Sequence, residues 1–164
     1  MKTLLVLRHA KSSWKEADLS DHDRPLNKRG KRDAPRMGEL LRQEDLVPDL
    51  ILSSTAKRAR TTAELVAEAS GYEGEIQLLR DLYAAGAEAF VEALQHVSSK
   101  YDCVMVVGHN PGLEELLEAL TGDYETLPTA ALGQVQLPVD EWAELREDTN
   151  GRLVSIWRPR ESGG

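Results

Sequence analysis

The side chains that could do chemistry in this sequence gather just after its apolar runs. Two of the four histidines, His9 and His109, and two arginines, Arg8 and Arg58, are placed in this way. A neutral imidazole is a nucleophile near neutral pH and can carry a phosphoryl group covalently. The guanidinium of arginine stays charged and matches the geometry of phosphate oxygens. Phosphoryl transfer needs mainly positioning and positive charge, so these residue types indicate chemistry on a phosphoryl group.

Each of these signals also has an ordinary structural interpretation. An Arg-His pair after a strand is more often a surface pair than a catalytic one. Residues 108–111 could be a turn followed by the start of a helix, and Arg58 is one basic residue on a basic helix. The functional interpretation therefore depends on the joint occurrence of the signals after three separate apolar runs.

The elements that must position these residues alternate between strands and helices. Strands are expected over residues 3–7, 49–53, 75–79, 103–107, 134–137 and 153–157, and helices over residues 28–43, 56–69, 87–97 and 113–120. Asn27 is expected to cap the first helix and Pro111 to occupy the first turn of the last. The alternation predicts an α/β fold, a three-layer sandwich with a mostly parallel central sheet and helices on both faces. Ligands bind such folds beyond the carboxyl ends of the strands.

The composition is that of one globular domain, expected over residues 1–160, with a disordered tail at residues 161–164. Hydrophobic residues make up 41% and charged residues 29% of the 164-residue chain. The single cysteine, Cys103, excludes an internal disulfide. No apolar run reaches the length of a signal peptide core or a membrane span. A cytoplasmic location without membrane contact is therefore expected.

Charge is unevenly distributed along the chain. The net charge of −8 argues against non-specific nucleic-acid binding, which needs a basic surface. Residues 24–36 nevertheless hold six basic residues against one acid, while residues 114–125 hold five acids and no base. The basic stretch could attract an anionic substrate, or it could be the solvated face of a helix.

Four segments together resemble the histidine phosphatase superfamily, whose fold is that of phosphoglycerate mutase. Residues 7–10, with the order Leu-Arg-His-Ala, resemble its Arg-His-Gly signature, with Ala10 in place of glycine. Residues 53–63 resemble its second motif and residues 107–111 its third. Residues 21–30 resemble the small SixA-type branch, the phosphohistidine phosphatases. The resemblance extends from Lys2 to Arg160, and its motifs are specific only in combination.

The resemblance implies a role for each of the four residues. His9 is the expected nucleophile, Arg8 and Arg58 are the expected phosphate ligands, and His109 completes the phosphate pocket and stabilises the transition state. No metal or organic cofactor is expected, and phosphate or other anions should bind in the site. The methyl group that Ala10 adds beside the nucleophile should be tolerated.

The general acid is the open part of the prediction. Larger members of the superfamily carry an acidic residue after the third strand, but neither Asp81 nor Glu88 aligns clearly with it. Three acids of a loop could instead supply a proton or line the rim of the site, namely Asp18, Asp21 and Asp23. His22 is expected at the surface or at that rim.

A site without a dedicated acid favours a leaving group better than an alkoxide. An imidazole, with a pKa near ~6.5, leaves readily when protonated. The expected substrate is therefore phosphohistidine on a signalling or phosphotransfer protein. A small-molecule phosphomonoesterase and a non-catalytic phosphate-binding module remain alternatives. A phosphomutase would need a second anchoring point and a lid, for which the chain leaves no room.

Overall fold

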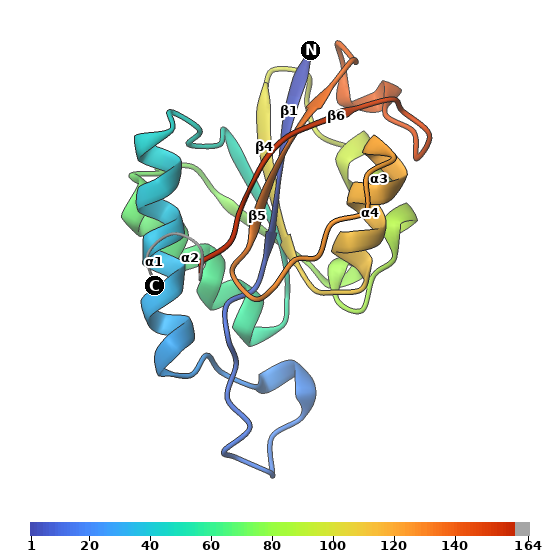
Figure 1. The fold of residues 1–164 in the computed structure, drawn as a ribbon. Helices are drawn as coiled ribbons and strands as arrows, with labels where there is room; N and C mark the ends of the chain where they lie inside the picture. The colour runs from blue at the N-terminus through green and yellow to red at the C-terminus, as the bar shows by residue number, and fades with distance from the viewer. Residues whose placement is uncertain (160–164) are drawn as a thin grey trace.

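A six-stranded sheet forms the centre of the computed structural model, which describes residues 1–159 (Figure 1). Its strands are β1 (Lys2–Arg8), β2 (Leu50–Ser54), β3 (Ile76–Leu79), β4 (Cys103–Gly108), β5 (Leu132–Leu137) and β6 (Arg152–Trp157). Their order across the sheet is β3-β2-β4-β1-β5-β6. The first four run parallel, and β5 is antiparallel to both neighbours. The predicted mostly parallel sheet is confirmed, while the tail expected at residues 161–164 lies outside the described residues.

Helices cover both faces of this sheet, as the three-layer prediction requires. Helices α1 (Lys28–Gln43) and α2 (Lys57–Ser70) pack on one face, and α3 (Ala87–Gln95) and α4 (Gly112–Thr121) pack on the other (Figure 1). Three short 3-10 helices, η1 (Asp21–Asp23), η2 (Arg80–Leu82) and η3 (Trp142–Glu144), lie in the connections.

Local sequence signals explain most of the helix ends. The Asn27 side chain caps α1 by accepting a hydrogen bond from the Gly30 N–H at 2.9 Å, as predicted. Helix α2 ends at Gly71, whose φ of 80° lies in the left-handed region that glycine adopts without strain. The prediction for Pro111 was wrong. Pro111 follows a cis peptide bond and is the N-cap residue, so α4 begins one residue later, at Gly112.

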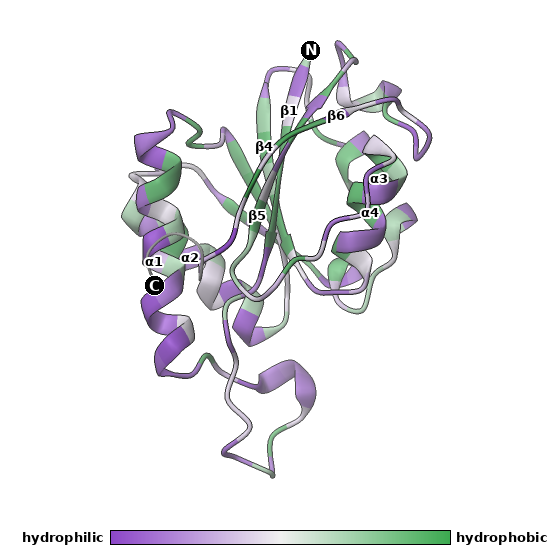
Figure 2. Ribbon diagram, viewed as in Figure 1, coloured by the Kyte–Doolittle hydropathy of each residue, from purple (hydrophilic) through white to green (hydrophobic). Residues whose placement is uncertain are grey.

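The core lies on both sides of the sheet because side chains of a strand alternate between its faces. In β1, Leu4 and Val6 pack toward α3 and α4, whereas Leu5 and Leu7 pack toward α1 and α2. All four residues are at most 1% exposed. This double burial explains why β1 appears in the sequence as an unbroken apolar run, and Figure 2 shows the hydrophobic sheet between helices with hydrophilic outer faces.

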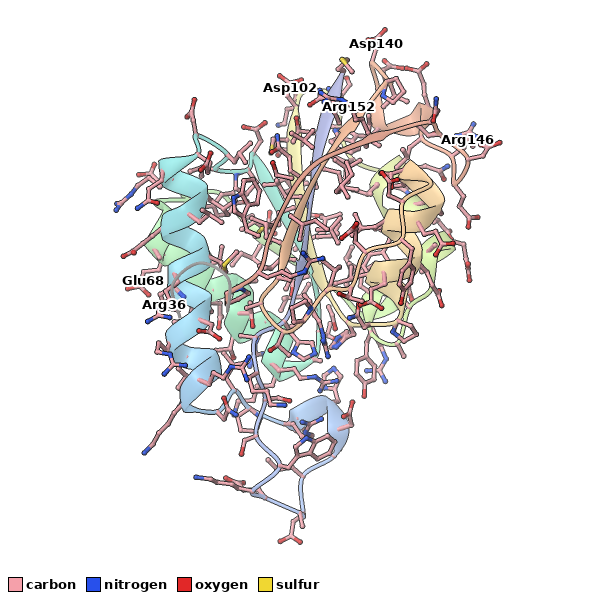
Figure 3. All side chains as sticks on the ribbon, viewed as in Figure 1. Arg36, Glu68, Asp102, Asp140, Arg146 and Arg152 are labelled. Atoms are coloured by element: carbon pink, nitrogen blue, oxygen red, sulfur yellow. The ribbon has the colours of Figure 1, made fainter. Side chains whose placement is uncertain are left out.

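The parallel strands end at one common edge of the sheet. Arg8 of β1 lies opposite Gly108 of β4, and Ser53 of β2 lies opposite Val107 of β4. The chain that follows β1 extends beyond this edge before it enters α1 (Figure 1). Figure 3 labels charged side chains that lie away from this edge, on the outer helices or at the other end of the sheet: Arg36, Glu68, Asp102, Asp140, Arg146 and Arg152.

Candidate active site

Strand register brings the two predicted site histidines side by side. The pairing of β1 with β4 continues one residue further, because the His9 N–H donates to the Gly108 carbonyl oxygen at 3.0 Å. The ring centroids of His9 and His109 are 5.0 Å apart. The residues are only 7% and 8% exposed, so both rings lie in a largely desolvated pocket.

The environment of His9 leaves one ring nitrogen ready to act as a nucleophile. Its Nδ1 lies 2.8 Å from the carbonyl oxygen of Ala10. A carbonyl oxygen can only accept, so Nδ1 carries the proton and Nε2 keeps its lone pair. Burial, assisted by the positive charges of Arg58 and Arg8, lowers the pKa of His9 from 6.5 to about 3. The ring is therefore neutral at physiological pH.

His109 is held from the neighbouring strand. Its Nε2 lies 2.8 Å from the hydroxyl oxygen of Ser54, the last residue of β2. Burial, with a contribution from Arg58, lowers the pKa of His109 from 6.5 to about 4. His109 is thus a second neutral imidazole beside the first.

Arg8 is anchored by the loop that precedes β5. Its Nη1 donates to the Leu127 carbonyl oxygen at 2.9 Å. The Leu127 N–H and the Asn110 amide both donate to Oε2 of Glu114 on α4, at 2.7 and 3.0 Å. Burial lowers the pKa of Arg8, and the Glu114 carboxylate opposes this effect. The loop and α4 therefore fix the guanidinium at the edge of the sheet.

Arg58 lies in the first turn of α2 and holds the loop after β1. Its Nη2 donates to the Asp21 carboxylate at 3.0 Å, and its Nη1 donates to the Asp21 backbone oxygen at 2.7 Å. The same carboxylate accepts from Arg24 at 3.0 Å and from the Tyr83 hydroxyl at 2.6 Å. The Tyr83 hydrogen bond and the two arginines hold the pKa of Asp21 well below its usual range.

The four predicted residues line one cavity of about 240 Å³. The cavity is lined by Arg8, His9, Lys11, Ser12, Trp14, Arg24, Arg58, His109, Asn110 and Thr129. Arg24 is, with Lys11, one of two lining cations that sequence reasoning missed. It is 7% exposed, and its guanidinium stacks 3.1 Å from the centre of the Trp14 ring. Its place in the basic stretch after Asp21 was the available signal, but that stretch did not single it out.

The three candidate acids differ in their surroundings. Asp18 is exposed, and Asp23 accepts from the Ser20 hydroxyl at 3.1 Å. Only Asp21 reaches the arginines of the site. Because its pKa is held low, Asp21 is an ionised partner of Arg58 at neutral pH, which does not suit a role as a proton donor.

Other titratable groups approach the site from η1 and from the segment after β3. Nε2 of His22 lies 2.9 Å from the Thr55 hydroxyl, and the His22 ring meets the Tyr83 ring edge to face at 4.9 Å. Tyr83 also lies edge to face against His109 at 5.6 Å. His22 thus lies at the rim as expected, whereas neither Asp81 nor Glu88 lines the cavity.

Most of the basic stretch belongs to the surface of α1. Arg29, Arg32 and Arg36 approach the buried Asp33 carboxylate at 3.5, 3.8 and 3.9 Å. These charges stabilise the helix locally, as the structural alternative supposed, and of this stretch only Arg24 lines the cavity.

The remaining features do not add to the site. A larger cavity of about 800 Å³ lies between α3 and the strands β2 and β3, and it contains none of the four predicted residues. Within residues 1–159, no group of three or more His, Cys, Asp and Glu side chains could hold a metal ion. None of the helices formed by these residues is long and apolar enough to cross a membrane.

Comparison with known proteins identifies the class. A family model of the histidine phosphatase superfamily (branch 1) matches residues 4–85, half of the chain. The chain belongs to this superfamily. It is also 36% identical over 152 residues to an uncharacterized chloroplastic protein of Arabidopsis thaliana, covering 87% of this chain and 70% of that protein.

The structural neighbours narrow the likeness to the SixA-type branch, with a phosphoglycerate mutase-like fold. A candidate phosphohistidine phosphatase SixA from Agrobacterium tumefaciens matches with a TM-score of 0.81 and 30% identity, over 96% of this chain and 98% of that one. A protein histidine phosphatase SixA in complex with tungstate matches with a TM-score of 0.83, over 98% and 99% of the two chains. At 22% identity, the second likeness shows the fold alone.

Proposed function

We propose that this phosphatase removes the phosphoryl group of phosphohistidine on another protein, without a metal, through a covalent intermediate on His9. One observation carries the proposal. A neutral His9, whose Nε2 is unprotonated, lines a cavity that is also lined by Arg8, Arg58 and His109. A nucleophile surrounded by phosphate-binding cations is the arrangement that phosphoryl transfer to a histidine requires.

The reaction proceeds in two displacements. The substrate's imidazole first takes a proton from water on its unphosphorylated ring nitrogen. Nε2 of His9 then attacks phosphorus, and the bond between phosphorus and the substrate's other ring nitrogen breaks as the imidazole leaves as a neutral ring. Water then attacks the phosphoryl group on Nε2, which releases inorganic phosphate and restores the neutral His9. In both steps Arg8 and Arg58 stabilise the negative charge on the three equatorial oxygens.

The choice of leaving group depends on whether the site offers an acid that can donate a proton. No carboxylate side chain of residues 1–159 lines the cavity, and Asp21, which approaches through Arg58, is held ionised. An alkoxide needs a strong proton donor in order to leave, whereas an imidazole does not. This favours phosphohistidine over phosphate esters of alcohols.

We propose that the partner is a signalling or phosphotransfer protein that bears phosphohistidine. We also propose that the two proteins meet in the cytoplasm. The neighbour from Agrobacterium tumefaciens, at 30% identity, supports this choice of partner by its name. The tungstate bound to the second neighbour shows that a protein of this fold can hold a phosphate-like anion.

The first experiment tests the nucleophile. His9→Ala should abolish hydrolysis of both p-nitrophenyl phosphate and a phosphohistidine protein, and wild-type enzyme quenched at alkaline pH should carry a phosphoryl group on His9 by mass spectrometry. His96→Ala is the matched control, because His96 caps the end of α3 and does not line the cavity. Unchanged hydrolysis by His9→Ala would show that His9 is not the nucleophile.

The second experiment tests the substrate class. The ratio kcat/KM is measured for a panel of phosphohistidine proteins and for common sugar phosphates. We expect the highest value for a phosphohistidine protein. A much higher value for a sugar phosphate would instead assign the protein as a small-molecule phosphomonoesterase, and binding of phosphate without any turnover would indicate a non-catalytic module.

A further inference from the structure

We propose that Ser54 is a positioning residue that sets the tautomer of His109. In this arrangement His109 keeps its proton on Nδ1 and donates a hydrogen bond from this N–H to the phosphoryl group in transit. The inference deepens the proposed function, on which the role in catalysis rests. The tautomer itself follows from the hydrogen bonds of the Ser54 hydroxyl and can be measured without any substrate.

Ser54 is buried at the point where β2 ends beside the site. Ser54 is 0% exposed, and its hydroxyl oxygen has two hydrogen-bond partners among the described residues. The Ala56 N–H donates to this oxygen at 3.2 Å, and Nε2 of His109 lies 2.8 Å from it. The Ser54 hydroxyl therefore accepts one hydrogen bond from a backbone group whose direction is fixed.

The position of the hydroxyl proton decides the tautomer. Within residues 1–159, the only acceptor in contact with the Ser54 hydroxyl is Nε2 of His109. A buried hydroxyl proton is paired wherever an acceptor is in reach, so the Ser54 O–H donates and Nε2 accepts. A neutral imidazole has one N–H, and the proton of His109 is then on Nδ1.

The Nδ1 atom of His109 is free to use that proton. It is buried and has no hydrogen-bond partner among residues 1–159. Phosphoryl oxygens are acceptors, so an N–H at this nitrogen attracts them, whereas a lone pair would repel them. Since burial keeps His109 neutral, the tautomer decides whether the ring offers a donor or an acceptor.

The two neighbouring histidines then offer different groups to the phosphoryl group, a lone pair from one ring and an N–H from the other. The Ala10 carbonyl oxygen fixes the proton of His9 on Nδ1, which exposes a lone pair at Nε2 for attack. Ser54 fixes the proton of His109 so that this ring offers an N–H instead. One neutral imidazole acts as nucleophile and the other as hydrogen-bond donor, without a charged histidine.

The decisive experiment reads the tautomer directly. Two-bond ¹H–¹⁵N correlation spectra of protein labelled at histidine are recorded near pH 7, and the His109 signals are assigned by their loss in His109→Gln. We expect the Nδ1–H tautomer for His109 in the wild type. An Nε2–H tautomer there would overturn the inference, whatever the enzyme's activity.

Matched serine variants test the cause. Ser54→Ala should lose the Nδ1–H preference and should lower kcat for p-nitrophenyl phosphate about 10- to 100-fold, with a smaller change in KM, in the range seen for other partners that orient a functional imidazole. Ser53→Ala is the control, because Ser53 is equally buried but donates to the Ser54 carbonyl oxygen rather than contacting His109. It should change neither quantity.

The possible results separate the two levels of the proposal. A wild-type tautomer and kcat retained in Ser54→Ala would overturn the role of Ser54. A tautomer that depends on Ser54, in a protein that shows no turnover and no phosphorylated His9, would support Ser54 as the determinant of the tautomer and contradict the proposed function.

Discussion

At the scale of single residues, the site combines two neutral imidazoles with permanently charged guanidiniums. Burial is the largest cause of the lowered pKa of both His9 and His109, and the nearby arginines act in the same direction. Arginine keeps its proton under the same burial because its pKa starts far higher. The same desolvated pocket therefore removes charge from histidine and leaves it on Arg8 and Arg58.

The lowered pKa of His9 predicts that activity falls on the acid side of the pH–rate profile only at an unusually low pH. Once corrected for ionisation of the substrate, kcat/KM should stay level from pH 7 to about 5 and fall only as His9 approaches its pKa of about 3. The free energy of unfolding should decrease as the pH falls from 6.5 toward 4, because the unfolded chain binds protons that the folded histidines exclude. An acid limb centred near pH 6.5 would contradict this environment for His9.

The Asp21 carboxylate predicts a measurable competition with phosphate for Arg58. In Asp21→Asn the ion pair is lost, so inorganic phosphate should bind more tightly by about 2- to 5-fold, the range for a partly exposed ion pair. Isothermal titration calorimetry measures the change. Asp23→Asn serves as control, because Asp23 pairs with Ser20 and His22 and not with Arg58. Weaker phosphate binding in Asp21→Asn would mean that the carboxylate mainly orders Arg58.

At the scale of elements, the strands were predictable and the loop after β1 was not. Apolar runs buried on both faces marked β1, β2 and β4, and all six expected strands lie within two residues of the observed bounds. Arg8, His9, Arg58 and His109 could be found because they follow those strands. The approach of Arg24 to the cavity depends on the path of residues 9–27, which have no periodic pattern and return through an isolated bridge between Ser12 and Leu26.

Two glycines of α1 make a matched test of what that helix supports. A Cβ at Gly30 would lie within 2.2 Å of the Lys11 carbonyl oxygen, just after the nucleophile. A Cβ at Gly38 would lie 2.6 Å from the Val66 carbonyl oxygen of α2, far along the helix from the site. Both substitutions to alanine should lower the free energy of unfolding by ~1–3 kcal/mol in urea titrations.

Activity should separate the two variants. Gly30→Ala must displace the segment that carries Lys11 and Ser12, so kcat/KM for p-nitrophenyl phosphate should fall as well. Gly38→Ala should keep the wild-type value below its unfolding transition. Equal kcat/KM in both variants would contradict the view that the N-terminus of α1 positions the loop after the nucleophile.

At the scale of the whole molecule, the residues of the site and a buried residue that stabilises the fold lie in different regions. The cavity lies at the carboxyl ends of β1, β2 and β4, whereas η3 packs against α3 with Trp142 fully buried. The Trp142 indole N–H donates to the Tyr101 carbonyl oxygen, just before β4 begins, at 2.7 Å. Changes near that indole are therefore expected to affect folding without reaching the reacting atoms.

Trp142→Phe makes this separation testable. Loss of the hydrogen bond and of packed volume should lower the free energy of unfolding by ~1–3 kcal/mol, measured by urea titration, with kcat unchanged. Trp14→Phe is the control for stability, because Trp14 is 73% exposed and its change should stay within about 0.5 kcal/mol. A fall in kcat for Trp142→Phe in fully folded protein would contradict the separation.

The contact between His9 and the Ala10 carbonyl oxygen has a consequence for how the site can change over evolution. The partner of the His9 ring is a backbone atom, so a change of the side chain at position 10 does not remove it. The sequence is free to vary there within the limits of a fully buried residue, which suits alanine in the place of glycine. His109 depends on a side chain instead, so a single mutation of Ser54 suffices to break its contact. The contact that orients His9 is thus insensitive to the side chain at position 10, whereas the contact that orients His109 is lost when Ser54 is substituted.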